Sequence, residues 1–264
     1  VAQRDGVILE VGPYQDLKNR YPEAATLGNG RQLLLPGLVN AHHHGRGVST
    51  LQMGQPDGPL ETWVHRAWGR RRLDPHLMAL YTAMQQVRSG TTAVMYNQSS
   101  GPVGHGRAEA EATLRAYQEV GIRVAFSVAY RNQCLLVYGD DAAFLATLPS
   151  ALAREVRSVV EEALMPVEDY LALCEEMAGR YPASDGATVR ILVSPQNYHW
   201  CDEVTLQRIA RFARQRGLGI HTHLAETMYQ RLYAERLHGQ TPAARLHQMG
   251  FLGPDVSLAH GVWL

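Results

Sequence analysis

From residue 33 onward, short apolar runs alternate with longer segments whose apolar residues recur at helical spacing. The runs typical of buried strands cover residues 33–40, 91–96, 122–130, 189–194, 218–223 and 256–260. Continuous apolar strands that alternate with helices favour an α/β fold with a parallel sheet covered by helices. A complete (β/α)8 TIM-type barrel needs eight such units and roughly 250 residues. The pattern therefore predicts a TIM-type barrel with about six of its eight units present.

Capping residues mark the ends of several predicted helices. Gly121 ends a helix that begins at residue 108, and Asp202 is expected to cap a helix that stops at Gly217. Thr241 and Pro242 open a third helix, as a cap followed by a first-turn proline. A fourth helix is expected at residues 167–180, and loops with extra helices at 54–61 and 131–166.

The first 32 residues follow a different pattern. A short strand follows a turn at residues 5–12, and a polar stretch runs from residue 14 to residue 32. We predict a remnant of a small flanking β-structure over residues 1–32 and a barrel over residues 33–264. Because the chain lacks an initiator Met, we expect it to be incomplete. Because only six of eight units are visible, we expect the barrel to lack its C-terminal part.

Charge and cysteine content exclude several classes of partner. Lys and Arg total 25, as do Asp and Glu, so no charge excess indicates a nucleic-acid or membrane-surface partner. Three scattered cysteines fit a cytoplasmic protein better than a disulfide scaffold. No apolar run is long enough for a membrane span, and no signal peptide is evident. Two surface features are also expected: a solvated helix face at residues 70–72, and His105.

Histidines stand at the ends of three predicted strands. His42 and His44 share one face of the first strand, because side chains two apart point the same way, and His43 points to the other. His223 ends the fifth strand and His260 the sixth. The carboxyl ends of parallel strands meet at one edge of a sheet, which is where functional groups collect. These residues therefore indicate a metal site.

Glu226 follows His223 by three residues in "HTHLAET". A carboxylate just past a strand-end ligand can reach the same cavity, and burial near a metal would tune it to carry protons.

At these positions the chain resembles the amidohydrolase superfamily. "PGLVNAHHH" is similar to the first-strand motif of that family, "HTHLAET" to its fifth-strand element and "SLAHGVWL" to its sixth. The order and spacing agree as well. The most similar branch holds the cytosine and guanine deaminases and the triazine chlorohydrolases.

The resemblance implies roles for five residues. His42, His44 and His223 would be metal ligands, Glu226 the proton shuttle, and His260 a contact to the metal-bound water or substrate. The last ligand of the family, an Asp after strand eight, is not present in this chain.

The resemblance also bears on the number of metal ions. Binuclear members bridge two metals through a carbamylated Lys after strand four, but Lys18 is the only lysine and lies outside the barrel pattern. One divalent metal is therefore expected. His and carboxylate ligands favour Zn²⁺, and Fe²⁺ is compatible.

Substrate contacts are expected from Gln52, Gln196 and His199. The related branch commonly has a His directly after the Pro that ends strand four, whereas Gln196 follows Pro195 here. Gln can donate and accept hydrogen bonds but carries no charge. Trp63 and Trp68 are expected to pack beneath a loop, although the resemblance implies that the segment after His44 shapes the pocket.

The leading hypothesis is a metal-dependent aminohydrolase, in which metal-bound hydroxide attacks an aminated N-heterocycle: a pyrimidine, purine, pterin or triazine. One alternative keeps the hydroxide but expels chloride or opens a cyclic amide. Another is an inactive truncated fragment, and we expect this chain alone to be poorly active. Unpaired outer strands favour association, so a homo-oligomer is expected.

Overall fold

A computed structural model describes residues 1–29, 31–69, 73–99, 106–184 and 186–264 of the chain. The expectations for residues 70–72 and for His105 concern positions outside the described residues. The chain divides into two compact units, Val1–Pro36 and Gly37–Leu264, which are treated separately. The sequence pattern puts the boundary between residues 32 and 33. The roles of the two parts, a flanking β-structure and a metal-dependent hydrolase barrel, stay a proposal.

The first unit contains a hairpin and a short helix. β1 (Ala2–Arg4) and β2 (Val7–Glu10) are antiparallel, and α1 (Tyr14–Arg20) follows. Asp5 and Gly6 form the turn with φ of 52° and 80°. Positive φ at both positions is what a two-residue hairpin of the right twist requires, and Asp-Gly supplies it at low cost. The strand predicted after this turn is β2. The polar stretch at residues 14–32 begins with α1.

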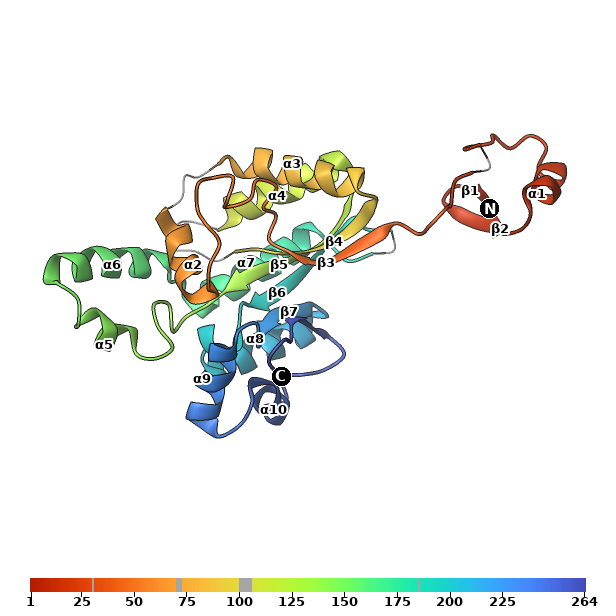
Figure 1. The fold of residues 1–264 in the computed structure, drawn as a ribbon. Helices are drawn as coiled ribbons and strands as arrows, with labels where there is room; N and C mark the ends of the chain where they lie inside the picture. Colours follow the sequence, from red (N-terminus) through yellow and green to blue (C-terminus); the bar gives the residue numbers. More distant parts are fainter. Residues whose placement is uncertain (30, 70–72, 100–105, 185) are drawn as a thin grey trace. The chain divides into compact units, whose positions relative to one another are not determined.

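The second unit is built on a six-stranded parallel sheet in chain order. Its strands are β3 (Leu38–His43), β4 (Thr91–Asn97), β5 (Arg123–Tyr130), β6 (Val189–Pro195), β7 (Gly219–Leu224) and β8 (Val256–His260). The outer strands approach each other, since the His42 ring on β3 lies 5.2 Å from the His260 ring on β8. The strands therefore form a nearly closed barrel, and the predicted partial TIM-type barrel is confirmed (Figure 1).

Helices lie between consecutive strands and cover the sheet (Figure 1). They are α2 (Leu60–Arg66), α3 (Pro75–Arg88), α4 (Arg107–Val120), α5 (Asp141–Leu145), α6 (Ser150–Ala163), α7 (Val167–Arg180), α8 (Glu203–Arg216), α9 (Met228–His238) and α10 (Pro242–Gln248). Short 3₁₀ turns occupy Ala67–Gly69 and Tyr198–Trp200.

The predicted helix ends are confirmed by their caps. The Asp202 carboxylate accepts a hydrogen bond from the Thr205 backbone N–H at 2.8 Å at the start of α8. The Thr241 hydroxyl oxygen accepts one from the Ala244 N–H at 3.3 Å. Gly121 follows α4 with φ of 80°, the left-handed conformation that ends a helix without a steric penalty.

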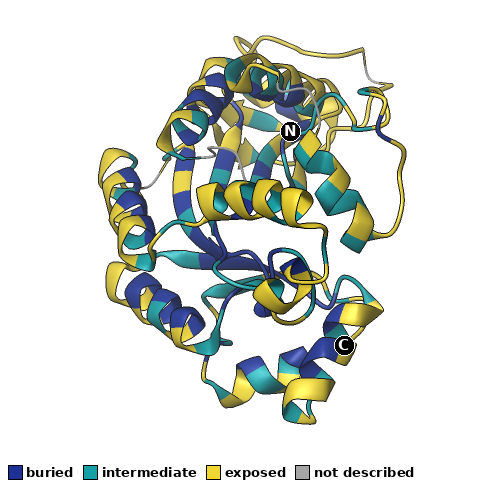
Figure 2. Cartoon of the chain, turned by 90° about the vertical axis from the view of Figure 1, so that its left-hand side faces the viewer, coloured by how far each residue is buried: buried dark blue, intermediate teal, exposed yellow. Residues whose placement is uncertain are grey.

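The main core lies between the strands and the inner faces of the helices. Along the helices, buried residues alternate with exposed ones (Figure 2). Its largest fully buried side chains include Phe126 of β5, Tyr117 of α4 and Ile209 of α8. Burial of such side chains is worth roughly 1.5–3 kcal/mol each and holds the helices against the strands. Within the described part of the chain, no helix combines the length and apolarity needed to cross a membrane.

Candidate metal centre and active site

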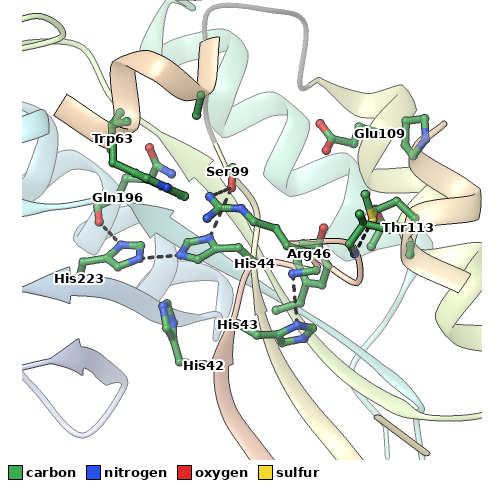
Figure 3. Close-up of a pocket in the computed structure, with 18 of the residues that line it drawn as sticks. His42, His43, His44, Arg46, Trp63, Ser99, Glu109, Thr113, Gln196 and His223 are labelled. Atoms are coloured by element: carbon green, nitrogen blue, oxygen red, sulfur yellow. Dashed lines mark hydrogen bonds between the residues drawn. The ribbon is translucent and has the colours of Figure 1, made fainter. Parts of the chain in front are cut away.

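Four histidines converge at the carboxyl ends of the barrel strands. His42 belongs to β3 and His44 directly follows it, while His223 belongs to β7 and His260 ends β8. The rings of His42 and His223 are 4.9 Å apart, and those of His223 and His260 5.3 Å apart, between centroids. Figure 3 shows His44 and His223 facing each other, with His42 beside them. The strand ends therefore bring together the four histidines that the sequence singles out.

The hydrogen bonds of His44 and His223 determine which ring nitrogens carry protons. His44 Nδ1 lies 2.9 Å from the Asn97 carbonyl oxygen, and His223 Nδ1 lies 2.6 Å from the Gln196 carbonyl oxygen. A carbonyl only accepts, so each Nδ1 must donate, and each neutral ring then keeps a bare lone pair on Nε2. The two Nε2 atoms face each other at 3.1 Å. Two lone pairs at this distance are complementary to a cation.

His42 and His260 extend this donor set. The His42 Nε2 atom is buried and has no hydrogen-bond partner among the described residues, which is costly for a polar atom. Ligand nitrogens of His42, His223 and His260 all lie within 4.8 Å of one another. Two nitrogens bound to one tetrahedral Zn²⁺ would be about 3.3 Å apart, given Zn–N bonds of about 2.0–2.1 Å. The residues present therefore fit a metal ion.

Burial keeps His42, His44 and His223 neutral at pH 7. It lowers the pKa of His42 to about 4, with smaller contributions from His221 and His260, and it lowers the pKa of His223 to about 3. The pKa of His44 lies well below its ordinary value, again mainly because the ring is buried. Neutral imidazole is the form that binds metals, so the lone pairs are available without loss of a proton.

Glu226 lies beside the histidine cluster. Its Oε1 is 3.5 Å from His260 Nε2, and its backbone N–H donates to Gln230 Oε1 at 2.9 Å. Burial raises the pKa of the Glu226 carboxyl above its ordinary value. Ala225 and His260 adopt left-handed backbone conformations, with φ of 47° and 73°. Such strain costs of order 1–3 kcal/mol for a residue with a side chain and gathers at functional sites.

A cavity of about 980 Å³ opens onto the cluster. Gln196 lines it next to His223, as predicted for a substrate contact, and Glu226 and His260 line it too. The remainder of the wall is largely apolar, from Met53, Leu60, Val64 and Met78. The cavity therefore combines a polar floor with an apolar wall, as ligand sites for flat organic molecules do.

The other two predicted substrate contacts lie elsewhere. Gln52 is exposed, and its Oε1 accepts a hydrogen bond from the Ser49 N–H at 2.8 Å. His199 is buried with its ring 4.8 Å from that of Tyr138 and 4.6 Å from that of Trp200. Neither is among the described residues that line the cavity.

Four further residues line the cavity, although the sequence does not predict them as substrate contacts. Arg131 directly follows β5 and is 3 % exposed. Its Nε and Nη2 atoms are buried and have no hydrogen-bond partner in the part of the chain that the structure describes. Its position after a strand end is the signal that would have found it. Trp63 and Trp68, expected to pack beneath a loop, line the cavity instead. The Arg46 guanidinium lies 4.7 Å from the centre of the Trp63 ring.

His43 lies on the opposite face of β3, as its register predicts. Its ring is 5.1 Å from the ring of Tyr96, and Nε2 is 3.4 Å from the hydroxyl of Tyr117 on α4. The Gly45 N–H donates to His43 Nδ1 at 3.2 Å. His43 therefore packs between the sheet and a helix and is not part of the metal-binding face.

Comparison with known proteins agrees with this geometry. Residues 33–264 match the Amidohydrolase family, and residues 1–24 match an imidazolonepropionase-like composite domain of bacteria.

Curated relatives include deaminases of adenine nucleosides. A 5'-deoxyadenosine deaminase of Methanothermobacter thermautotrophicus is 30% identical over 99% of this chain and 54% of its own length. A 5-methylthioadenosine/S-adenosylhomocysteine deaminase of Thermodesulfovibrio yellowstonii is 26% identical over 98% of this chain and 52% of its own length. The chain thus spans about half the length of these relatives.

Solved structures share the fold. The atrazine chlorohydrolase of Arthrobacter aurescens TC1, complexed with zinc, superposes with a TM-score of 0.60 at 20% identity, over 86% of this chain and 49% of that one. An adenosine deaminase from Xanthomonas campestris with bound zinc superposes with a TM-score of 0.58 at 20% identity, over 84% of this chain and 44% of that one.

Proposed function

Because the chain belongs to the amidohydrolase family, we propose that it carries the metal centre of an aminohydrolase that releases ammonia from an aminated N-heterocycle. The observation that carries this proposal is the cluster of four histidines at the strand ends with Glu226 beside it. Family membership supplies the reaction class, and the cluster supplies the groups that the reaction needs.

We assign His42, His44 and His223 as ligands of one divalent metal ion, with His260 against the same centre. Imidazole nitrogens suit Zn²⁺, and Fe²⁺ is also compatible with them. Zinc in the two structurally similar proteins supports Zn²⁺. When bound, the ion would act as a Lewis acid that lowers the pKa of water towards neutrality.

Glu226 would carry the proton in this reaction. Burial raises the pKa of this carboxyl, which would favour its taking a proton from the attacking water and giving it to a ring nitrogen of the substrate. His260, 3.5 Å away, would orient the attacking group. Gln196 would hydrogen-bond the heterocycle, and its position in the cavity lining supports this role.

Adenine nucleosides are the proposed substrate class. The two curated relatives act, by name, on 5'-deoxyadenosine and on methylthioadenosine or adenosylhomocysteine. The cavity of about 980 Å³ is at the upper end of the range for drug-sized ligands, so it is larger than a bare purine ring needs. The unpaired donors of Arg131 would meet polar atoms of the substrate away from its amine.

The test is product analysis with the zinc-loaded protein. The panel would contain 5'-deoxyadenosine, methylthioadenosine, adenosylhomocysteine, aminated pyrimidines, pterins and triazines, a chlorotriazine and a cyclic amide. We expect ammonia from the adenine nucleosides. Release of chloride or ring opening without ammonia would establish the alternative leaving groups. Bound zinc without any product, or no stoichiometric zinc at all, would favour the inactive-fragment hypothesis.

Assembly and location are proposed on more general grounds. The outer strands β3 and β8 each pair with a single neighbour among the described residues, so we propose a homo-oligomer, to be tested by light scattering. Free thiols at Cys134, Cys174 and Cys201 support a cytoplasmic location.

A further inference from the structure

We propose that His221 and Ser257 act as a positioning pair that fixes the orientation and the protonated nitrogen of His42. This inference rests on the proposed metal centre. It concerns metal affinity, and its test does not depend on the identity of the substrate.

A chain of hydrogen bonds runs from His42 away from the cavity. His42 Nδ1 lies 2.8 Å from His221 Nε2, and His221 Nδ1 lies 3.1 Å from the Ser257 hydroxyl oxygen. His221 is 1% exposed. It faces Ser257 directly, since the two are register partners in the β7–β8 pair. The three side chains thus connect β3, β7 and β8 beneath the cluster.

The direction of these hydrogen bonds decides whether His42 can bind a metal. A neutral His42 has a lone pair on Nε2 only when its proton sits on Nδ1, and that Nδ1–H must then donate to His221 Nε2. His221 Nε2 accepts only when its own proton sits on Nδ1, which donates to the Ser257 hydroxyl oxygen. In the reverse direction, His221 donates to His42 Nδ1, and the proton on His42 Nε2 blocks the ligand position.

His42 differs from the other two proposed ligands in how it is held. His44 and His223 donate their Nδ1–H groups to the backbone carbonyls of Asn97 and Gln196, which no substitution removes. For His42, the group that faces Nδ1 at 2.8 Å is instead the side chain of His221, which a substitution can remove. Partners of this kind orient a ligand ring and raise its basicity, and their loss typically lowers metal affinity 10–100-fold.

His221 acts through His42 and not on the substrate. Strand alternation puts His221 and His223 on the same face of β7, with His221 one pleat deeper in the barrel. Neither His221 nor Ser257 is among the described residues that line the cavity. Both are therefore positioning residues.

The experiment measures Zn²⁺ affinity of the whole chain by competition with a chromophoric chelator. We expect His221→Phe, which keeps an aromatic ring but removes the acceptor, to weaken Zn²⁺ binding about 10–100-fold. His221→Gln places an amide oxygen where Nε2 stood and should restore affinity to within a few-fold of the wild type. Ser257→Ala should show a smaller loss than His221→Phe, and the exposed His247→Gln no change.

Two results would overturn the inference: wild-type affinity in a folded His221→Phe protein, or a loss with His221→Gln as large as with His221→Phe. A wild-type protein without Zn²⁺ affinity would instead refute the metal centre itself. If His221→Phe does not fold, ¹⁵N-histidine NMR of the wild type decides the question. We expect protons on Nδ1 of both His42 and His221, and a proton on His221 Nε2 would contradict the proposed direction.

Discussion

At the residue scale, Glu226 and His260 both line the cavity, and the backbone is left-handed at Ala225 and at His260. The pKa of Glu226 is raised by burial, and its Oε1 lies 3.5 Å from His260 Nε2. Burial favours the protonated form of a carboxyl, so Glu226 accepts a proton more readily than an ordinary surface carboxylate does.

Replacement of that carboxyl tests its role. We expect Glu226→Gln to lower kcat about 10²–10⁴-fold, because an amide of the same size cannot carry the proton. Zinc content should stay at the wild-type level, since Glu226 is not a proposed ligand. Steady-state kinetics and metal analysis measure both. Glu175→Gln, at a surface carboxylate paired with Arg216, is the matched control and should be silent. Unchanged kcat in Glu226→Gln would remove Glu226 from the mechanism.

His43, which is not itself a proposed ligand, gives a prediction about the pH dependence of stability. Burial lowers its pKa to about 4 from an unfolded value near 6.5. The unfolded chain therefore binds more protons than the folded chain between these two values, and stability falls as pH decreases through this range. From pH 7 to pH 5 the loss from His43 alone is about 2 kcal/mol.

Urea unfolding at the two pH values measures this loss. His43→Gln, which keeps a donor and an acceptor but does not titrate, should show a shallower pH dependence than the wild type. Equal slopes in the two proteins would contradict the assignment of a buried neutral His43.

At the scale of elements, two glycines with similar φ differ in what surrounds them. Gly45 follows the histidine run with φ of 64°, and a Cβ there would lie 2.3 Å from a ring carbon of Tyr96. Gly121, at the end of α4 with φ of 80°, has open space around its Cβ position.

The pair separates backbone strain from crowding. Gly121→Ala should cost about 1–2 kcal/mol, the price of a left-handed conformation alone. Gly45→Ala should cost about 1–3 kcal/mol more, because overpacking adds to the strain. It should also weaken Zn²⁺ binding, since Gly45 adjoins His44. Chemical denaturation and chelator competition provide the measurements, and equal costs at the two sites would disprove the crowding argument.

Most elements could be read from the sequence because their signals are local. Asp202 and Gly121 act within one turn of the helix that they cap, so their effect does not depend on the distant fold. The position of α2 over the cavity has no such signal. Trp63 looks like a packing residue in sequence, and only the return of the chain over the strand ends makes it part of the cavity wall.

At the scale of the whole molecule, the metal centre depends on closure of the barrel. The proposed ligands come from the end of β3 and from β7, and His260 of β8 lies against them. A metal ion can therefore bind this cluster only when the three strands come together. We therefore expect Zn²⁺ to stabilise the folded state by about 2.7 kcal/mol at a hundred times its Kd.

For a unit of this size that corresponds to a rise in Tm of roughly 5–10 °C. Differential scanning calorimetry with and without Zn²⁺, and after removal by EDTA, measures it. His42→Ala should lose the Zn²⁺-dependent rise while folding at the Tm of the metal-free protein or slightly below. The same rise in His42→Ala would mean that Zn²⁺ binds elsewhere.

The sequence by itself determined the alternation of strands and helices and the histidines at the strand ends, because periodicity and capping act over a few residues. Only the tertiary structure decided how these side chains meet. His42 and His221 are separated by 179 positions, as are His44 and His223, and their contacts arise from curvature of the sheet. That curvature determines which ring nitrogens are free, buries Arg131 beside the site, and places Gln52 and His199 away from the cavity wall.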